Sequence, residues 1–329
     1  MNFEVLKNHN EMKNMERLYI AIVSNISFEP YIDIEINRCF FRKNIIVEVI
    51  RIDYNSLNCD STLDLISNCD IVVVIPNFEY SYSGVLYQQF KNDITIDIVL
   101  KRELSNMKSV YSLIRTYTLA PLMWFSYEDY YSYEDVVLGD IFFENNVVDC
   151  INRYLFCKKP SGMYLVDMKQ LVAKVGVCHA YNIKNKYLWN SPYSQLMVSQ
   201  ICQSIYKQYL INHGFTKKCI VLDCDNVIWG GILSEDGVEG IHIANNGLGR
   251  VYYEFQQFLL FLYQHGIILT ICSKNDELDV MRVFREHNEM ILKEDNIACF
   301  FVNWENKVDN ILKIANILNI GLESMVFID

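Results

Sequence analysis

Two aspartates stand two residues apart directly after the apolar run Cys219–Leu222. A run of this length and composition is typical of a buried parallel strand. Because strand side chains alternate between faces, Asp223 and Asp225 leave the end of that strand on the same side. The pair Gly230-Gly231 that follows allows a tight turn and a close approach of the main chain to a ligand. Two aligned carboxylates suit a hard divalent cation and one covalent or acid–base step.

Three more residues have side chains that could take part in a reaction. Ser273, Lys307 and Asp329 lie at or just after the ends of other predicted strands. In an open parallel sheet, ligands bind outside the carboxyl ends of the strands, so we expect these side chains to converge. Phosphoryl chemistry needs such a set: a carboxylate that attacks phosphorus, cations that offset anionic charge, a hydroxyl for phosphate and a second carboxylate for protons. The alternative is that the strand-end Asp and Ser residues only cap the helices that follow.

The elements that must position these residues form a repeating strand–helix pattern over residues 215–329. Strands are expected at Cys219–Leu222, Ile267–Cys272, Ala298–Phe301 and Met325–Ile328, and helices at Val251–His265, Glu277–Glu286 and Lys307–Leu318. Alternation of this kind predicts a parallel sheet that is covered by helices on both faces.

Residues 15–212 repeat the alternation and form a separate predicted domain, preceded by a leader at 1–14. Strands are expected at Leu18–Val23, Ile45–Ile50, Ile71–Ile75, Leu122–Phe125 and Met163–Val166, and helices from near Pro30 and at about 84–115, 146–157 and 192–212. The predicted fold is therefore α/β, with two doubly wound parallel-sheet domains.

Composition limits the functions that remain. The net charge of -11 argues against a nucleic-acid-binding protein, which needs a basic face. The 11 cysteines are scattered and include no Cys-x-x-Cys pair, which argues against a disulfide framework or a zinc ribbon. Free cysteines in this number are more typical of the reducing cytoplasm. The polar start of the chain does not resemble a signal peptide, and no apolar run approaches the length of a membrane span.

Four sequence motifs in order resemble the haloacid dehalogenase superfamily. They are Asp223–Val227 with Trp229–Gly231, Ile271–Asn275, Asn303–Lys307 and Val326–Asp329. More narrowly, the segment from about Lys217 to Asp329 is similar to the FkbH-like branch, subfamily IIIC. The resemblance implies a Rossmann-like domain, a Mg²⁺ cofactor and a small phosphorylated substrate.

The resemblance also implies a role for each motif residue. Asp223 would be the nucleophile and a metal ligand, and Asp225 would be the general acid/base and would offer its main-chain carbonyl to the metal. Ser273 would bind phosphate, Lys307 would hold phosphate against the nucleophile, and Asp329 would ligate the metal. Residues expected to contact substrate are Trp229, Gly230, Lys274 and Asn275; for Trp229, a packing role is an equal alternative.

FkbH-like proteins imply a more specific reaction, the transfer of a glyceryl-type acyl group from an acyl phosphate to an acyl carrier protein. Attack at phosphorus gives hydrolysis, whereas attack of a thiol at the carbonyl carbon gives a thioester. Cys272 precedes Ser273, and a neighbouring lysine and metal would lower the pKa of its thiol, so it is a candidate nucleophile. A buried strand cysteine is the alternative interpretation.

Two departures from the family pattern favour other functions. Val227 stands where a threonine is usual, and the family normally continues past Asp329 with a second Asp and more sheet, so we expect a truncated domain. A plain small-molecule phosphatase and a catalytically impaired binding protein are therefore the alternatives to acyl transfer.

The first domain resembles, more weakly, the SGNH-hydrolase-like domain that precedes the phosphatase-like domain in this family. The supporting stretches are Val23–Pro30 and Trp189–Ser194. An esterase of this kind needs a Gly-Asp-Ser turn and an Asp-x-x-His pair. Here the turn reads Ser24-Asn25, and Gly176 stands three residues before His179. We therefore expect docking rather than ester hydrolysis from this domain.

Overall fold

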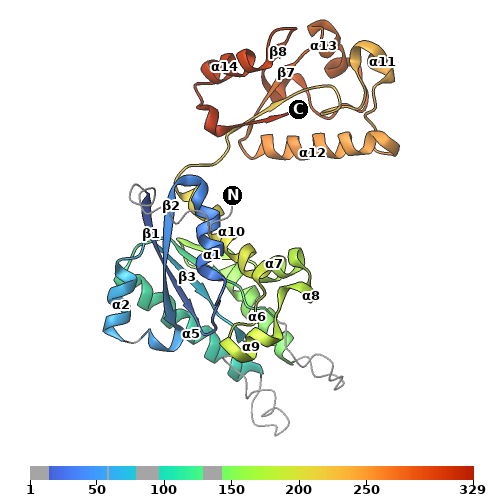
Figure 1. Ribbon diagram of the computed structural model, residues 1–329. Helices are drawn as coiled ribbons and strands as arrows, with labels where there is room; N and C mark the ends of the chain where they lie inside the picture. The colour runs from blue at the N-terminus through green and yellow to red at the C-terminus, as the bar shows by residue number, and fades with distance from the viewer. Residues whose placement is uncertain (1–14, 58, 79–95, 129–142) are drawn as a thin grey trace. The chain divides into compact units, whose positions relative to one another are not determined.

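The chain divides into two compact units, Met1–Tyr209 and Leu210–Asp329 (Figure 1). The computed structural model describes residues 15–57, 59–78, 96–128 and 143–329. The expected leader at 1–14 and the first part of the helix expected from Gly84 lie outside these residues. No helix in the described part is long and apolar enough to cross a membrane.

Five parallel strands form the sheet of the N-terminal unit, in the order β2-β1-β3-β4-β5. Their bounds are β1 Glu16–Ser24, β2 Ile45–Asp53, β3 Ile71–Ile75, β4 Leu122–Phe125 and β5 Met163–Val166. This 2-1-3-4-5 order is that of flavodoxin-like sheets, in which the chain reverses direction across the sheet between the first and third strands.

Helices connect these strands and cover both faces of the sheet (Figure 1). They are α1 Ile32–Phe40, α2 Asp60–Ser67, α5 Ile96–Tyr117, α6 Phe143–Lys158, α7 Met168–Val175, α8 Val177–Ala180, α9 Ile183–Trp189 and α10 Gln195–Asn212. Phe40 of α1 meets Tyr206 and Tyr209 of α10 edge-on, with ring centroids 4.9 and 5.1 Å apart. The helices therefore pack against one another as well as on the sheet.

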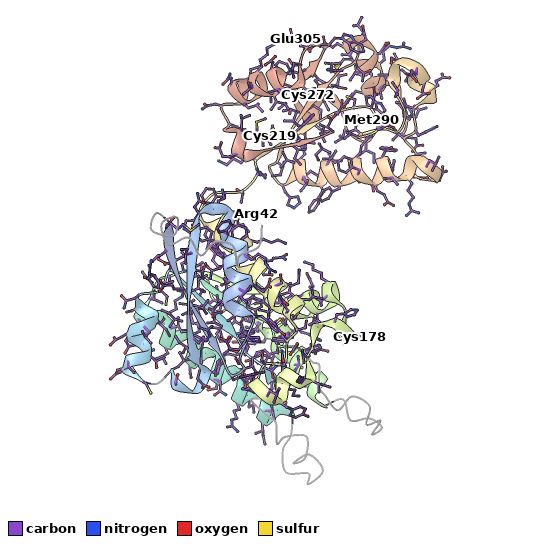
Figure 2. All side chains as sticks on the ribbon, viewed as in Figure 1. Arg42, Cys178, Cys219, Cys272, Met290 and Glu305 are labelled. Atoms are coloured by element: carbon purple, nitrogen blue, oxygen red, sulfur yellow. The ribbon has the colours of Figure 1, made fainter. Side chains whose placement is uncertain are left out.

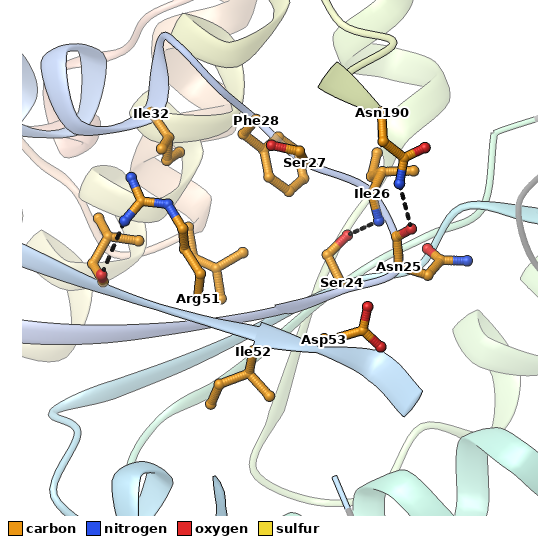
Figure 3. A pocket seen from close by; sticks show the side chains of 12 residues that line it. Ser24, Asn25, Ile26, Ser27, Phe28, Ile32, Arg51, Ile52, Asp53 and Asn190 are labelled. Atoms are coloured by element: carbon orange, nitrogen blue, oxygen red, sulfur yellow. Dashed lines mark hydrogen bonds between the residues drawn. The ribbon is translucent and has the colours of Figure 1, made fainter. Parts of the chain in front are cut away.

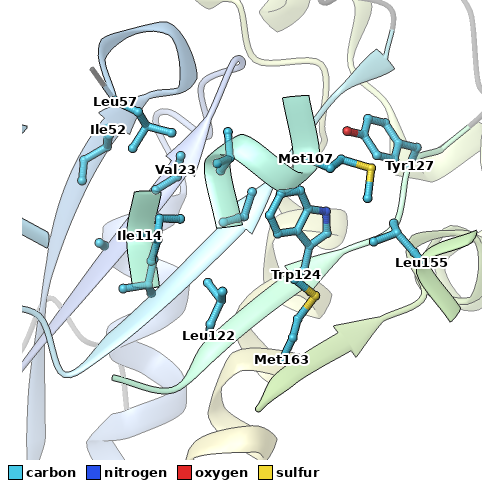
Figure 4. Packing of buried hydrophobic residues seen from close by; sticks show 14 of the residues in the cluster. Val23, Ile52, Leu57, Met107, Ile114, Leu122, Trp124, Tyr127, Leu155 and Met163 are labelled. Atoms are coloured by element: carbon cyan, nitrogen blue, oxygen red, sulfur yellow. The ribbon is translucent and has the colours of Figure 1, made fainter. Parts of the chain in front are cut away.

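The core on one face of this sheet is dense and apolar (Figure 4). Helix α5 contributes Val99, Met107, Val110 and Ile114, whose spacing places them on one stripe of the helix. Trp124 of β4 is completely buried among them. Burial of a large side chain of this kind stabilises a fold by roughly 1.5–3 kcal/mol, so the sheet is held mainly by apolar contacts.

A carboxamide from α1 reaches the outer edge of the same sheet at β2. The side chain of Asn37 donates to the carbonyl oxygen of Val47 at 3.0 Å and accepts from the Val47 amide at 2.8 Å. Both polar main-chain groups of this edge residue are thereby satisfied inside the molecule.

The C-terminal unit has a four-stranded parallel sheet in the order β8-β7-β6-β9. The strands are β6 Cys219–Leu222, β7 Ile268–Ser273, β8 Ile297–Val302 and β9 Met325–Ile328, and the helices are α11 Leu233–Gly240, α12 Arg250–Gln264, α13 Glu277–Glu286 and α14 Lys307–Leu318. The predicted α/β class with two parallel sheets is confirmed.

The two faces of the C-terminal sheet carry separate apolar clusters. Ile220 and Leu222 face a cluster that includes Leu259 of α12 and Val280 of α13. Cys219, Val221 and Cys272 face a second cluster that is closed by Ile314 of α14. With both faces covered, the open place for polar groups is the edge formed by the strands' carboxyl ends.

Candidate active site

The carboxyl edge of the C-terminal sheet brings together the predicted strand-end residues. The amide of Asp223 donates to the carbonyl oxygen of Ile328 at 2.9 Å, so the pairing of β6 with β9 continues to the first aspartate and places Asp329 beside it. The amide of Asn303 donates to the carbonyl oxygen of Ser273 at 3.1 Å, which extends the pairing of β7 with β8 in the same way.

Lys307, the first residue of α14, links two of these carboxylates. Its Nζ lies 2.6 Å from Oδ2 of Asp223 and also donates to Oδ1 of Asp329. The side chains of Asp223 and Lys307 are 14% and 22% exposed, whereas that of Asp329 is 51% exposed. The ammonium group also lies 5.6 Å from the ring centroid of Phe327. One cation is thus held between two carboxylates at a partly open edge.

These contacts shift the pKa values of the charged groups. Desolvation by burial would lower the pKa of Lys307, but the hydrogen bonds to Asp223 and Asp329 outweigh it and the pKa is raised. The hydrogen bond from Lys307 is the main cause of a lowered pKa for Asp329, and the nearby Lys274 adds a smaller effect in the same direction. Lys307 therefore remains charged, and Asp329 remains ionised, at neutral pH.

Asp225 is held by three donors. Its Oδ1 accepts from the indole Nε1 of Trp229 at 2.9 Å and from the amide of Leu233 at 3.1 Å, and its Oδ2 accepts from Nδ2 of Asn275 at 3.0 Å. The same Nδ2 also lies 3.2 Å from Oγ of Ser273. The carboxylate is therefore fixed in orientation, and its Oδ2 accepts from one of these donors where Oδ1 accepts from two.

Three of the four residues predicted to contact substrate have other roles. Trp229 is completely buried, and its indole donates to Asp225, which favours the packing alternative over a substrate contact. The amide and carbonyl of Gly230 are both used by His242, and a Cβ at Gly230 would lie 2.6 Å from the ring of Tyr252. Asn275 is buried and is used by Asp225 and Ser273.

Lys274 is the fourth of these residues, and it is exposed. It lies between the buried residues Ser273 and Asn275 in the loop after β7 and acts electrostatically on Asp329. Its position agrees with a contact to an anionic substrate, which remains a prediction.

Cys272 does not have the properties of an activated thiol. It is completely buried in the cluster beneath α14, where Figure 2 also places Cys219, and its Sγ lies 3.8 Å from the main-chain oxygen of Lys307. Burial raises the pKa of the Cys272 thiol, and the positive charge of Lys307 offsets this only in part. Desolvation is thus the larger effect at this position, opposite in direction to the lowered thiol pKa that was expected, and a nucleophilic role of Cys272 stays a prediction.

The carboxylates at this edge are of the type that binds a hard cation, but in this structure Asp223 and Asp329 are both bonded to Lys307. Carboxylate oxygens of Asp223 and Asp329 are suitable ligands for such an ion. The side chain of Asp225 is turned toward its three donors, so its main-chain carbonyl is the group left for a metal. Within the described ranges, no three His, Cys, Asp or Glu side chains are already grouped to hold a metal ion.

Two buried amide side chains near this edge were not predicted to matter. Gln256 of α12 donates to the carbonyl oxygen of Ile228, and Asn310 of α14 donates to Oδ1 of Asn303 at 2.8 Å. Each is completely or almost completely buried. The sequence could have indicated both residues, because each is a polar side chain at a position where the helical periodicity predicts an apolar one.

A pocket of about 220 Å³ lies in the N-terminal unit, at the carboxyl ends of β1 and β2 (Figure 3). Ser24 lines it, but the Ser24 hydroxyl donates to the carbonyl oxygen of Ile75 at 2.6 Å and accepts from the amide of Ile26. No histidine is among the described residues that line this pocket. Ser24 thus has a structural hydrogen bond in place of the general base that an esterase needs.

Comparison with known proteins identifies the fold but not the family. No family of known proteins and no curated protein matches the chain. A solved structure of the N-terminal part of the protein BF1531 from Bacteroides fragilis, which contains a phosphatase domain complexed with Mg, is similar with a TM-score of 0.81 and 24% identity. The likeness covers 97% of this chain and 85% of that one, and it shows that the two-unit α/β fold is shared.

Two other solved structures are more distant. The lipase Lip_vut3 from a goat rumen metagenome has a TM-score of 0.44 and 13% identity, over 58% of this chain and 98% of that one. The salicylyl-acyltransferase SsfX3 from a tetracycline biosynthetic pathway has a TM-score of 0.36 and 11% identity, over 60% of this chain and 55% of that one. Neither likeness is close enough to inform the function of this chain.

Proposed function

We propose that the chain is a Mg²⁺-dependent phosphatase-type enzyme of the haloacid dehalogenase superfamily, acting on a small phosphate ester or acyl phosphate with Asp223 as nucleophile. The observation that carries the proposal is the contact of Lys307 with both Asp223 and Asp329 at the carboxyl edge of the sheet. The Mg-complexed phosphatase domain in the similar Bacteroides fragilis structure supports the same cofactor here.

The chain's own residues account for both halves of the reaction. A carboxylate oxygen of Asp223 attacks phosphorus, the bond from phosphorus to the leaving oxygen breaks, and Asp225 gives that oxygen a proton. Water then attacks the phosphorus of the phosphoaspartate and passes its proton to Asp225, which releases phosphate and restores Asp223. Lys307 and Ser273 bind phosphate oxygens during both steps.

A metal would be held by Asp223, Asp329 and the main-chain carbonyl of Asp225. Bound there, it would offset the negative charge of the phosphate.

Phosphate release from acetyl phosphate and from p-nitrophenyl phosphate tests the proposal. Release should require Mg²⁺ and should fall by about a thousandfold or more in Asp223→Asn, because the nucleophile is lost. Asp309→Asn, on the exposed first turn of α14, is the matched control and should keep full activity. Wild-type protein that releases no phosphate from either compound with Mg²⁺ would contradict the proposal.

Acyl transfer to an acyl carrier protein is a finer form of the same proposal. In this form the thiolate of the carrier attacks the carbonyl carbon of an acyl phosphate, the carbon–oxygen bond to phosphate breaks, and phosphate leaves. A chain thiol is not needed for this step, in agreement with the burial of Cys272. Mass spectrometry of the carrier after incubation with enzyme and acyl phosphate is decisive: an added acyl mass supports transfer, and free acid with unmodified carrier excludes it.

A further inference from the structure

Gln256 is a polar side chain completely buried in the apolar interior of the C-terminal unit. It lies on α12, one helical turn before Leu259 and Leu260, and its amide makes three hydrogen bonds to main-chain groups. Nε2 donates to the carbonyl oxygen of Ile228 at 2.6 Å, and Oε1 accepts from the amides of Ile291 and Leu292 at 2.9 and 3.2 Å. Three bonds of this kind fix the side chain in one orientation.

The carbonyl that Gln256 holds belongs to the turn that follows the two aspartates. Ile228 donates its amide to the carbonyl oxygen of Cys224 at 3.0 Å, which closes one helical turn directly after Asp223. The peptide group that contains the Ile228 carbonyl also contains the Trp229 amide, so fixing this carbonyl fixes the plane from which Trp229 extends. The indole of Trp229 in turn donates to Asp225 at 2.9 Å.

The other end of Gln256 is anchored to a second segment of the chain, at Ile291 and Leu292. Met290 and Leu292 are both buried in the cluster on this face of the sheet. The side-chain amide of Gln256 thus connects this packed segment to the turn after the aspartates. Because the segment is packed, the connection restricts the orientation of the Trp229 indole. A glutamine that only completed the core would have no reason to affect Asp225.

We propose that Gln256 is a positioning residue, which holds the Ile228–Trp229 peptide so that the indole N–H of Trp229 stays on Asp225. Its effect on catalysis rests on the proposed function, in which Asp225 transfers protons. Its effect on the indole does not depend on any activity.

The indole N–H groups give a direct readout in the full-length chain. The sequence has four tryptophans, so a sample labelled with ¹⁵N-tryptophan shows four indole signals. Trp229→Phe assigns the signal of interest. Gln256→Met, which keeps the size of the side chain and removes its hydrogen bonds, should shift the Trp229 signal and accelerate its hydrogen exchange about tenfold. Gln257→Met, at the exposed neighbouring position, is the matched control and should change neither.

Enzyme kinetics give the second readout. Gln256→Met should lower kcat for phosphate release about tenfold and change KM less than twofold, because it disturbs the group that moves protons and not the groups that bind phosphate. A purely structural role would instead lower the amount of folded protein and leave kcat per folded molecule unchanged.

A second variant keeps the test informative if Gln256→Met does not fold. Gln256→Glu retains an oxygen that accepts from Ile291 and Leu292, and its second oxygen can donate to Ile228 only while the carboxyl group is protonated. The Trp229 indole signal of this variant should therefore move with pH, while that of wild-type protein should not. An unchanged Trp229 indole signal and exchange rate in folded Gln256→Met, or at every pH in folded Gln256→Glu, would overturn the proposal. A displaced indole together with no phosphate release by wild-type protein would support the positioning role and refute the proposed function, so the two failures are distinguishable.

Discussion

The ammonium group of Lys307 is the feature whose removal gives the sharpest test of the site's electrostatics. Lys307→Met keeps most of the apolar stem and deletes the charge between Asp223 and Asp329. Two unit charges separated by 2.6 Å attract with about 6 kcal/mol at an effective dielectric constant of 20. Desolvation of the pair opposes this attraction, and the half-exposed Asp329 reduces the loss further. We therefore expect the free energy of unfolding of the C-terminal unit to fall by about 2–4 kcal/mol.

Urea unfolding followed through the indole signal of Trp229 measures this value, because that residue reports on the C-terminal unit alone. Lys313→Met is the matched control on the same helix. Lys313 pairs with Glu305, but their side chains are 51% and 58% exposed, so its loss should cost about 0–1 kcal/mol. A further substitution, Asp329→Asn in the Lys307→Met background, should recover part of the lost stability because it removes one of two carboxylates that face each other.

Equal losses in Lys307→Met and Lys313→Met would refute the reasoning. They would mean that the partly buried contact contributes no more than an exposed ion pair. A double variant that is no more stable than Lys307→Met would show that repulsion between the two carboxylates is not the cause of the loss.

Three further predictions concern other groups of the C-terminal unit. Burial lowers the pKa of His287 from its usual 6.5, so its contribution to stability is complete above that pH and declines as the pH falls toward the folded-state pKa. His287→Gln should therefore flatten the pH dependence of the unfolding free energy below pH 6.5, and an unchanged slope would contradict the assignment. Iodoacetamide should modify the exposed Cys59, Cys157 and Cys178 well before Cys272 in native protein, as peptide mass spectrometry can check; equal rates would show that the Cys272 thiol is accessible. Asn275→Leu removes the hydrogen bond to Oδ2 of Asp225 and should lower kcat about tenfold, because a hydrogen bond to a charged group contributes about 1.5–3 kcal/mol. An unchanged kcat would show that Asp225 does not need this donor.

The strands and the longer helices could be predicted from the sequence because their signals are local. Continuous apolar runs bounded by polar residues located β3, β4, β5, β6 and β9 at their observed bounds. Helices α13 and α14 were also predicted at their observed bounds. Strand β2 continues to Asp53, three residues beyond the expected end, because it pairs residue for residue with β1. Pairing with a neighbour extends a strand past the point where its own composition favours one.

Short helices were missed, since their signals are weak or depend on tertiary structure. Helix α7 begins at Met168 because Asp167 caps it by accepting from the amides of Lys169 and Gln170, yet Asp167 was interpreted only as the end of a strand. Helix α11 contains Gly237 with φ of +69°, a break that no helical periodicity predicts.

The convergence of Asp223, Lys307 and Asp329 followed from sheet topology, whereas the environment of each side chain did not. Cys272 and Ser273 are neighbours in one strand, so alternation of faces places the Cys272 thiol in the apolar cluster beneath α14, a burial that its place in the motif did not indicate. The contact of Trp229 with Asp225 depends on the turn between them, whose geometry is set in part by Gln256 on a distant helix. Motif spacing carries no information about such a contact.

The carboxamide of Asn37 has a consequence for how this molecule meets its neighbours. An edge strand with free main-chain groups is a template onto which a strand of another chain can add. At Val47 both groups are already bonded to Asn37, so an incoming strand would find the ladder interrupted at the third residue of β2. Helix α1 thus protects this edge against intermolecular strand addition, and hence against aggregation, with a single side chain.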